Sequence, residues 1–181
     1  MKPDAYVIVA TIRALRYQGG AKKGEYENPN LPYLKNGFRN LTKHIENGFK
    51  FGLKPIVAIN HFATDSVEEI NYIIDECEKL GVKAILADEF TKGGAGMTEL
   101  AEEVVRCAEF YGNDFKPLYQ VEDSVEHKID TIAKEVYGAE SVVYSQKAKN
   151  QLKTIYDLGF DKVPICMAKT QKSLTDDETK L

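Results

Sequence analysis

Three short apolar segments, separated by longer stretches with helical patterning, constrain the fold of this chain more than any other feature. They span residues 5–11, 55–60 and 82–87, and nearly every side chain within them is apolar. Such continuous runs are typical of strands whose two faces are both covered. Because strands that alternate with helices pair in parallel through right-handed crossovers, we predict an α/β fold with a parallel sheet and flanking helices.

The stretches between these segments place apolar residues three and four positions apart, which indicates helices. The first helix follows an exposed loop at 18–33 and ends at Gly52. For the second helix, Asp65 and Glu68 form the predicted capping pair. A third helix, from about residue 98 to 111, follows a glycine-rich turn. The apolar positions are Leu34, Phe38, Leu41, Ile45 and Phe49 in the first helix and Val67, Ile70, Ile74 and Cys77 in the second.

The pattern changes after residue 113, which predicts a second part of the molecule. Its expected elements are strands at 115–121 and 163–168 and helices at 124–137 and from 145 to about 159. We place the domain boundary inside this region. Residues 1–137 are predicted to form an α/β domain, and residues 138–181 a partial second lobe with a polar tail.

Composition and charge narrow the classes of partner. The net charge is −4 and the isoelectric point is about 5.5, which gives no reason to expect a nucleic acid or a membrane surface as partner. No window approaches the roughly 18 apolar residues of a membrane span. The three cysteines, Cys77, Cys107 and Cys166, are too widely spaced for a zinc or redox motif. Reduced thiols in a cytoplasmic protein are therefore the expectation.

Polar or glycine-rich residues follow each predicted strand. The segments are 11–20, 60–65, 88–96 and 169–173. Ligands of open parallel sheets bind beyond the carboxyl ends of the strands, so these segments are candidates for one composite site. Ordinary surface loops are also polar, and the residues alone give the two interpretations equal weight.

The segment 60–65 contains a large aromatic side chain at a strand-to-helix turn. Thr64 or Asp65 can cap the following helix, which accounts for their polarity. Phe62 offers a flat face to a planar ligand or packs into the core, and the core is the commoner place for such a ring. His61 is a weaker candidate for a catalytic role.

The segment Lys92-Gly93-Gly94-Ala95-Gly96 has two interpretations. Its amides can cradle a phosphate at a helix N-terminus, or the glycines can simply form a turn. It is not a phosphate-binding loop of the Gly-Lys-Ser/Thr kind. Phe90 lies just before it, which places a second aromatic residue at a strand end.

Residues 9–20 closely resemble the signature VATxRALKxHGG of the formate–tetrahydrofolate ligase family. Arg16 stands where the family usually has Lys, and Gln18 where it has His or Asn. Further blocks match in the same order at 60–65, 92–94 and 166–171. The chain is therefore identified, by resemblance over its whole length, as a member of this family.

The resemblance implies an activity and its partners. The family uses ATP to join formate to tetrahydrofolate through formyl phosphate, giving 10-formyltetrahydrofolate. It implies ATP with magnesium and a monovalent cation as cofactors, and tetrahydrofolate, formate and ATP as the molecules bound. The complete protein is expected to be a cytoplasmic homo-oligomer.

The resemblance also implies roles for individual residues. Phe62 matches the aromatic residue that packs on the pterin, and Phe90 matches a position usually held by Trp on the opposite wall. Three polar residues, Asn60, Thr64 and Asp65, match positions around this site. Lys92, Gly93 and Gly94 are expected to bind substrate, while no catalytic residue is assigned.

The Gly-Lys-Ser/Thr motif that binds phosphate in this family has no counterpart among the 181 residues. We therefore expect a truncated part of a P-loop-type ligase that is inactive alone. The alternative is a non-catalytic folate- or nucleotide-binding module. A GTPase-like protein is a weaker alternative, because 60–65 only partly matches the base-reading motif Asn-Lys-x-Asp.

Overall fold

The computed structural model describes residues 2–110, 114–168, 174–175 and 177. The predicted site segment 169–173 lies outside these residues. The chain divides into two compact units at residues 115 and 116. This division falls earlier in the chain than the domain boundary predicted after residue 137.

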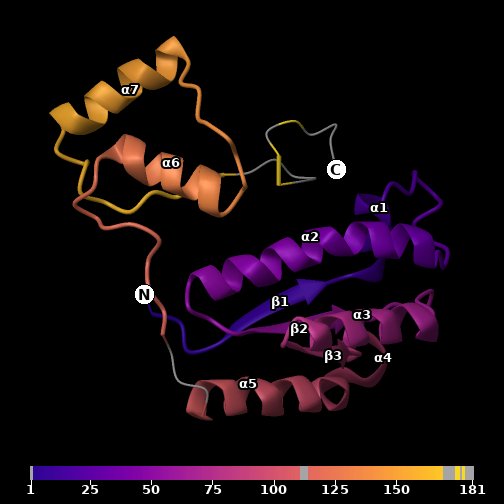
Figure 1. The fold of residues 1–181 in the computed structure, drawn as a ribbon. Helices are drawn as coiled ribbons and strands as arrows, with labels where there is room; N and C mark the ends of the chain where they lie inside the picture. Colours follow the sequence, from indigo (N-terminus) through magenta and orange to yellow (C-terminus); the bar gives the residue numbers. More distant parts are fainter. Residues whose placement is uncertain (1, 111–113, 169–173, 176, 178–181) are drawn as a thin grey trace. The chain divides into compact units, whose positions relative to one another are not determined.

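Unit 1 is built on a three-stranded parallel sheet with the strand order β1-β2-β3 (Figure 1). The strands are β1 (Tyr6–Ala10), β2 (Pro55–Asn60) and β3 (Lys83–Ala87). The register pairs Ile8 with Val57 and Ala58 with Ile85. The predicted α/β fold with a parallel sheet and flanking helices is confirmed.

Helices cover both faces of this sheet, so the central strand β2 is buried along most of its length (Figure 1). One core lies under α1, α2 and α3, and includes Leu34, Ile45 and Ile73. The other lies under α5 and includes Leu100 and Cys107. The helices are α1 (Ile12–Gln18), α2 (Leu31–Lys50), α3 (Val67–Lys79), α4 (Glu89–Lys92) and α5 (Thr98–Phe110), with a 3₁₀ helix at Gly93–Met97.

Helix α1 was not predicted, and two glycines fix its place against α2. A Cβ atom on Gly19 would lie 1.8 Å from the carbonyl oxygen of Tyr33, and one on Gly37 would lie 1.8 Å from that of Leu15. The two backbones therefore approach so closely that only glycine fits at either position. This contact fixes α1 beside the carboxyl end of β1.

The start of α3 corrects the predicted cap. Ser66 is the N-cap residue and forms a reciprocal capping box with Glu69, whereas Asp65 and Glu68 were predicted for these roles. The carboxylate of Asp65 instead accepts a hydrogen bond from the Phe62 amide at 2.8 Å. Asp65 thus shapes the loop after β2, and the N-cap of α3 is Ser66, one residue later than predicted.

Unit 2 contains the helices α6 (Val125–Glu135) and α7 (Gln146–Asp157). The strands predicted at 115–121 and 163–168 are wrong, because among the described residues neither segment pairs with a neighbouring strand. They meet instead through a side chain, since the Ile165 amide donates to the Tyr119 hydroxyl at 2.8 Å. A strand needs such a neighbour to satisfy its backbone groups.

A buried lysine joins α6 to the chain that follows α7. Lys128 is fully buried, and its Nζ donates to the carbonyl oxygens of Asp161 at 2.7 Å and Val163 at 3.2 Å. Among all the described residues, no helix is long and apolar enough to cross a membrane.

Candidate functional site

The parallel strands bring three of the predicted site segments to one edge of the sheet. Asn60 at the end of β2 is in register with Ala87 at the end of β3. The amide of His61 donates to the carbonyl of Ala87 at 3.0 Å, so the backbones that leave β2 and β3 separate only beyond this point. The loops that carry Phe62 and Phe90 therefore begin side by side.

Phe62 is half-buried, and a cation covers its ring. The guanidinium carbon of Arg13, in the first turn of α1, lies 4.0 Å from the ring centroid. A cation placed over an aromatic face is attracted by the electrons of the ring. Arg13 therefore takes up one face of the ring that was predicted to stack on a pterin.

Behind Phe62 lies a buried ion cluster, defined as Arg16, Asp65 and Glu69. The Nε and Nη2 atoms of Arg16 donate to the two carboxylate oxygens of Glu69 at 2.8 and 2.5 Å. Arg16 Nη2 also lies 3.9 Å from Asp65 Oδ1, and all three side chains are at most 1% exposed. This bidentate geometry is the strongest form of an arginine–carboxylate pair.

Glu69 and Arg16 together bind three further residues of the surrounding chain. Glu69 accepts hydrogen bonds from the Asn30 amide at 2.9 Å and the Ser66 hydroxyl at 2.7 Å, while Arg16 donates to the carbonyl of Tyr26 at 3.0 Å. Burial raises the pKa of Glu69, but the bonds from Arg16, Ser66 and Asn30 outweigh burial and lower the pKa to about 2. Glu69 is therefore an anion at neutral pH.

The loop after β3 is held differently. Phe90 lies on the four-residue helix α4 and is 94% exposed. Beneath it, the carboxylate of Asp88 contacts Lys92 Nζ at 3.1 Å and His61 Nδ1 at 3.4 Å. Hydrogen bonds from Lys92 and Thr91 lower the pKa of Asp88. Asp88 thus ties α4 to the end of β2, while the Phe90 ring itself projects into solvent.

The glycine segment forms a helical turn. Gly93 and Gly94 belong to the 3₁₀ helix that leads into α5, and Gly93 has a φ of +58°. The carbonyl of Gly96 accepts a hydrogen bond from the Asp88 amide at 3.2 Å. A Cβ atom on Gly96 would lie 2.2 Å from the Asp88 carbonyl oxygen, so this glycine serves close backbone packing.

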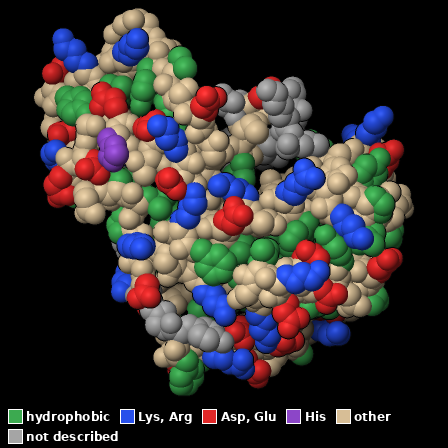
Figure 2. Space-filling view, in the orientation of Figure 1, with side chains coloured by type: hydrophobic (Ala, Val, Ile, Leu, Met, Phe, Trp, Pro, Cys, Tyr) green, Lys and Arg blue, Asp and Glu red, His purple; other side chains and the backbone are tan. Residues whose placement is uncertain are grey.

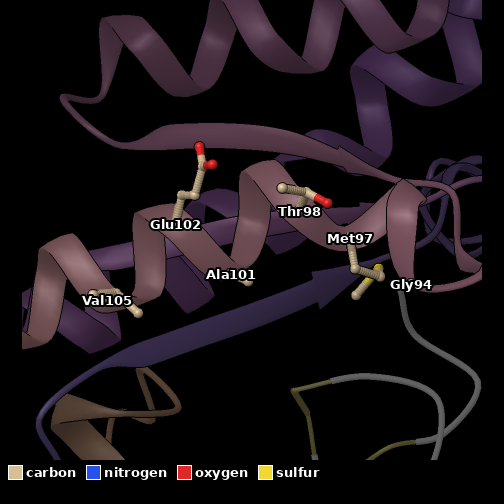
Figure 3. Close-up of a pocket in the computed structure, with 6 residues that line it drawn as sticks. All are labelled: Gly94, Met97, Thr98, Ala101, Glu102 and Val105. Atoms are coloured by element: carbon tan, nitrogen blue, oxygen red, sulfur yellow. The ribbon is translucent and has the colours of Figure 1, made fainter.

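An open groove runs along α5, next to this glycine turn (Figure 3). Its lining is mostly apolar, and Val105 is 54% exposed. In the space-filling view, acidic and basic side chains are interspersed rather than gathered into a region of one sign (Figure 2). The groove residues are Gly94, Met97, Thr98, Ala101, Glu102 and Val105.

Comparison with known proteins identifies the family. The sequence model described as "Formate--tetrahydrofolate ligase" matches residues 1–181. The chain belongs to the formate–tetrahydrofolate ligase family. Two curated ligases of this name are similar to it. One, from Limosilactobacillus fermentum, is 51% identical, and the other, "Formate--tetrahydrofolate ligase 2" from Lactobacillus acidophilus, is 49% identical.

Each match covers 99% of this chain but 32% of the relative. The chain thus spans about a third of the length of the curated ligases it matches. Most of the relatives' length therefore has no counterpart among these residues.

Within this ligase-family chain, the structure groups some of the predicted site residues and separates others. Phe62 and Asp65 share one hydrogen-bonded loop, and Lys92 lies near its base through Asp88. Thr64 is exposed and Asn60 is half-buried. Gly93 and Gly94 are exposed in the 3₁₀ helix.

The side chains that contact these residues were not predicted from the sequence. Neither the stacking of Arg13 on Phe62 nor the burial of Arg16 was expected, although the three-residue spacing of the two arginines was visible. The capping box was recognisable from the sequence, because Ser66 and Glu69 have the spacing that the motif requires. The second role of Glu69, as the counter-ion of Arg16, depends on a residue 53 positions away and could be found only in the structure.

Proposed function

We propose that this chain supplies the tetrahydrofolate-stacking part of an ATP-dependent ligase that joins formate to tetrahydrofolate, giving 10-formyltetrahydrofolate. The observation that carries the proposal is the aromatic platform Phe62 at the carboxyl end of β2, backed by Arg13 in a chain of the ligase family. Open parallel sheets bind their ligands at this edge.

The proposed role of Phe62 is to orient the pterin. A reduced pterin stacked on the face that Arg13 does not cover would be held in one plane, so that its reacting nitrogen points consistently toward an activated formyl group. Holding two reactants in this way supplies much of the rate enhancement of a group transfer. Phe90, exposed on α4, would close over the other side of the pterin as the second wall. Asn60 and Thr64 add polar groups at the rim.

The residues described here do not fit the binding of ATP and magnesium. No Gly-Lys pair occurs in the sequence, and the glycine segment is folded into a helical turn. Three or more His, Cys, Asp or Glu side chains suited to a metal ion do not gather anywhere among the described residues. We therefore assign the activation of formate to other parts of the complete ligase, and expect this chain to be inactive alone.

Titration of tetrahydrofolate into the 181-residue chain tests the proposal. Phe62→Ala is expected to raise the dissociation constant about tenfold, because stacking of a ring on an aromatic side chain contributes roughly 1–3 kcal/mol. Phe160→Ala, which removes an exposed ring from unit 2, is the matched control and leaves the constant unchanged. Equal affinity of the Phe62→Ala variant and the unaltered chain would refute the stacking role.

A second measurement separates the ligase from the alternative of a binding module. The chain is incubated with formate, ATP and tetrahydrofolate, and 10-formyltetrahydrofolate is measured. We expect no turnover by this chain alone. Measurable turnover would contradict the assignment of formate activation to other parts of the ligase. Nucleotide binding without folate binding would favour a nucleotide-binding module instead.

A further inference from the structure

We propose that Arg16 is a positioning residue for the folate site, which acts by holding Asp65 and, through it, the stacking residue Phe62. The inference rests on the proposed function, because it concerns the platform on which the pterin would stack. It assigns a role in binding to a residue that is fully buried and does not contact the ligand.

The connection runs through the loop after β2. Phe62 and Asp65 are joined twice, since the Phe62 amide donates to Asp65 Oδ2 at 2.8 Å and the Asp65 amide donates to the Phe62 carbonyl at 2.9 Å. The other oxygen, Asp65 Oδ1, is buried without a hydrogen bond and faces Arg16 Nη2 at 3.9 Å. The charge of Arg16 therefore compensates a buried carboxylate that shapes the Phe62 turn.

Helix α1 meets the same loop at a second point. Arg13 lies one turn before Arg16 and covers the Phe62 ring at 4.0 Å. The ring and the backbone of Phe62 are thus both held from α1, the first by Arg13 and the second through Asp65. Glu69 completes the arrangement, because its bidentate bond fixes the guanidinium plane of Arg16.

A buried ion pair is not needed for stability alone. Replacing such a pair by apolar residues of similar volume is often neutral or stabilising, whereas removing one partner is costly. This asymmetry allows positioning to be separated from folding. An apolar pair in place of Arg16 and Glu69 keeps the volume of the core but leaves Asp65 without its cation, and so releases the Phe62 loop.

The test uses the double variant Arg16→Met/Glu69→Met in the full chain. We expect the double variant to stay folded at the temperature of the titration, with an unfolding midpoint above that of Arg16→Met, which leaves two carboxylates without the cation. The dissociation constant of the double variant for tetrahydrofolate is expected to rise about fivefold. In a Phe62→Ala background the same double substitution changes the constant less than twofold. The matched control is Lys79→Met/Glu76→Met, which removes a surface ion pair from α3, the helix that carries Glu69. This control should leave the affinity for tetrahydrofolate unchanged.

Amide hydrogen exchange supplies a readout that needs no folate. Exchange at the Phe62 amide is expected to accelerate about tenfold in the double variant, while exchange at the amides of β2 stays the same. If the unaltered chain fails to bind tetrahydrofolate, the proposed function is wrong, but faster exchange at Phe62 would still support the positioning of this loop by Arg16.

Three results would overturn the inference. The first is a folded double variant with unaltered affinity and unaltered exchange at Phe62. The second is a loss of affinity that persists in full when Phe62 is already Ala, because Arg16 would then act elsewhere. If the double variant does not fold, Arg16→Lys keeps a positive charge at this position but loses both the Nη2 atom that faces Asp65 and the bidentate bond to Glu69. Unaltered affinity and unaltered exchange at Phe62 in the Arg16→Lys variant would be the third result.

Discussion

The loops that follow β2 and β3 each carry a phenylalanine assigned to the pterin site, yet they are held in opposite ways. Phe62 is half-buried, hydrogen-bonded to Asp65 and covered by Arg13. Phe90 is 94% exposed on a helix of four residues. One wall of the predicted slot is therefore fixed before any ligand arrives, and the other is not.

This difference indicates that the two phenylalanines would contribute to binding in different ways. A pre-organised side chain loses little conformational entropy when a ligand binds, whereas an exposed one must be ordered at that moment. Phe62 is thus suited to set the orientation of a pterin, and Phe90 to close over it. The predictions below test whether the two loops differ as much in energy as they do in geometry.

The largest expected effect comes from the ion cluster behind Phe62. Arg16→Met removes the cation and leaves Glu69 and Asp65 buried without it, which should lower the free energy of unfolding by about 3–5 kcal/mol. Denaturant titration measures the change. In the other loop, Lys92→Met removes an exposed partner of Asp88 and should cost less than about 0.5 kcal/mol. Similar losses in both variants would break the comparison.

The loop after β3 has one rigid point, at its base. Gly96→Ala places a Cβ atom 2.2 Å from the Asp88 carbonyl oxygen and should destabilise the chain by about 2–3 kcal/mol. Gly94→Ala is the control, because a Cβ atom there meets nothing within 4 Å. Thermal unfolding of the two variants distinguishes a loop fixed at its base from one that is mobile throughout, and equal midpoints would contradict this distinction.

Acid should weaken the loop after β2 through Glu69. Its pKa is lowered from 4.5 to about 2 in the folded chain, so its contribution to stability is present above pH 4.5 and is lost as the pH falls toward 2. Denaturant titrations between pH 6 and 2 should show that the stability advantage over Glu69→Gln, about 2 kcal/mol, shrinks across this range. An advantage that is independent of pH would show that Glu69 is not stabilised as an anion.

The sequence was sufficient for the sheet and for the two helices of unit 2, which lie within the predicted ranges 124–137 and 145–159, but not for the segments that flank these helices. Covered parallel strands are continuous apolar runs, and the runs at 5–11, 55–60 and 82–87 each contain a strand of the structure. The segments at 115–121 and 163–168 are also rich in apolar residues, yet they form no strand. Apolar patterning describes burial, whereas a strand also requires a neighbour with which to pair, and that depends on distant parts of the chain.

The sequence predicted where the segments of the candidate site lie, but not the buried residues that hold them. Placement at the carboxyl ends of the strands followed from topology, and Phe62 stood out because capping does not explain an aromatic residue. The burial of Arg16 was not predictable, because arginine is usually exposed and the partner that allows its burial lies 53 residues away. Long-range ion pairs leave no local pattern in the sequence.

The smallest expected effect is the most direct comparison of the two aromatic residues. Phe62→Ala should lower the free energy of unfolding by about 1–2 kcal/mol, since it removes a half-buried ring and its contact with Arg13. Phe90→Ala should change it by less than about 0.5 kcal/mol, because a ring that is 94% exposed contributes little to the folded state. Denaturant titration of both variants without ligand isolates this difference. A cost for Phe90→Ala that matches the cost for Phe62→Ala would mean that both walls are built before the ligand binds, and that α4 does not close over the pterin.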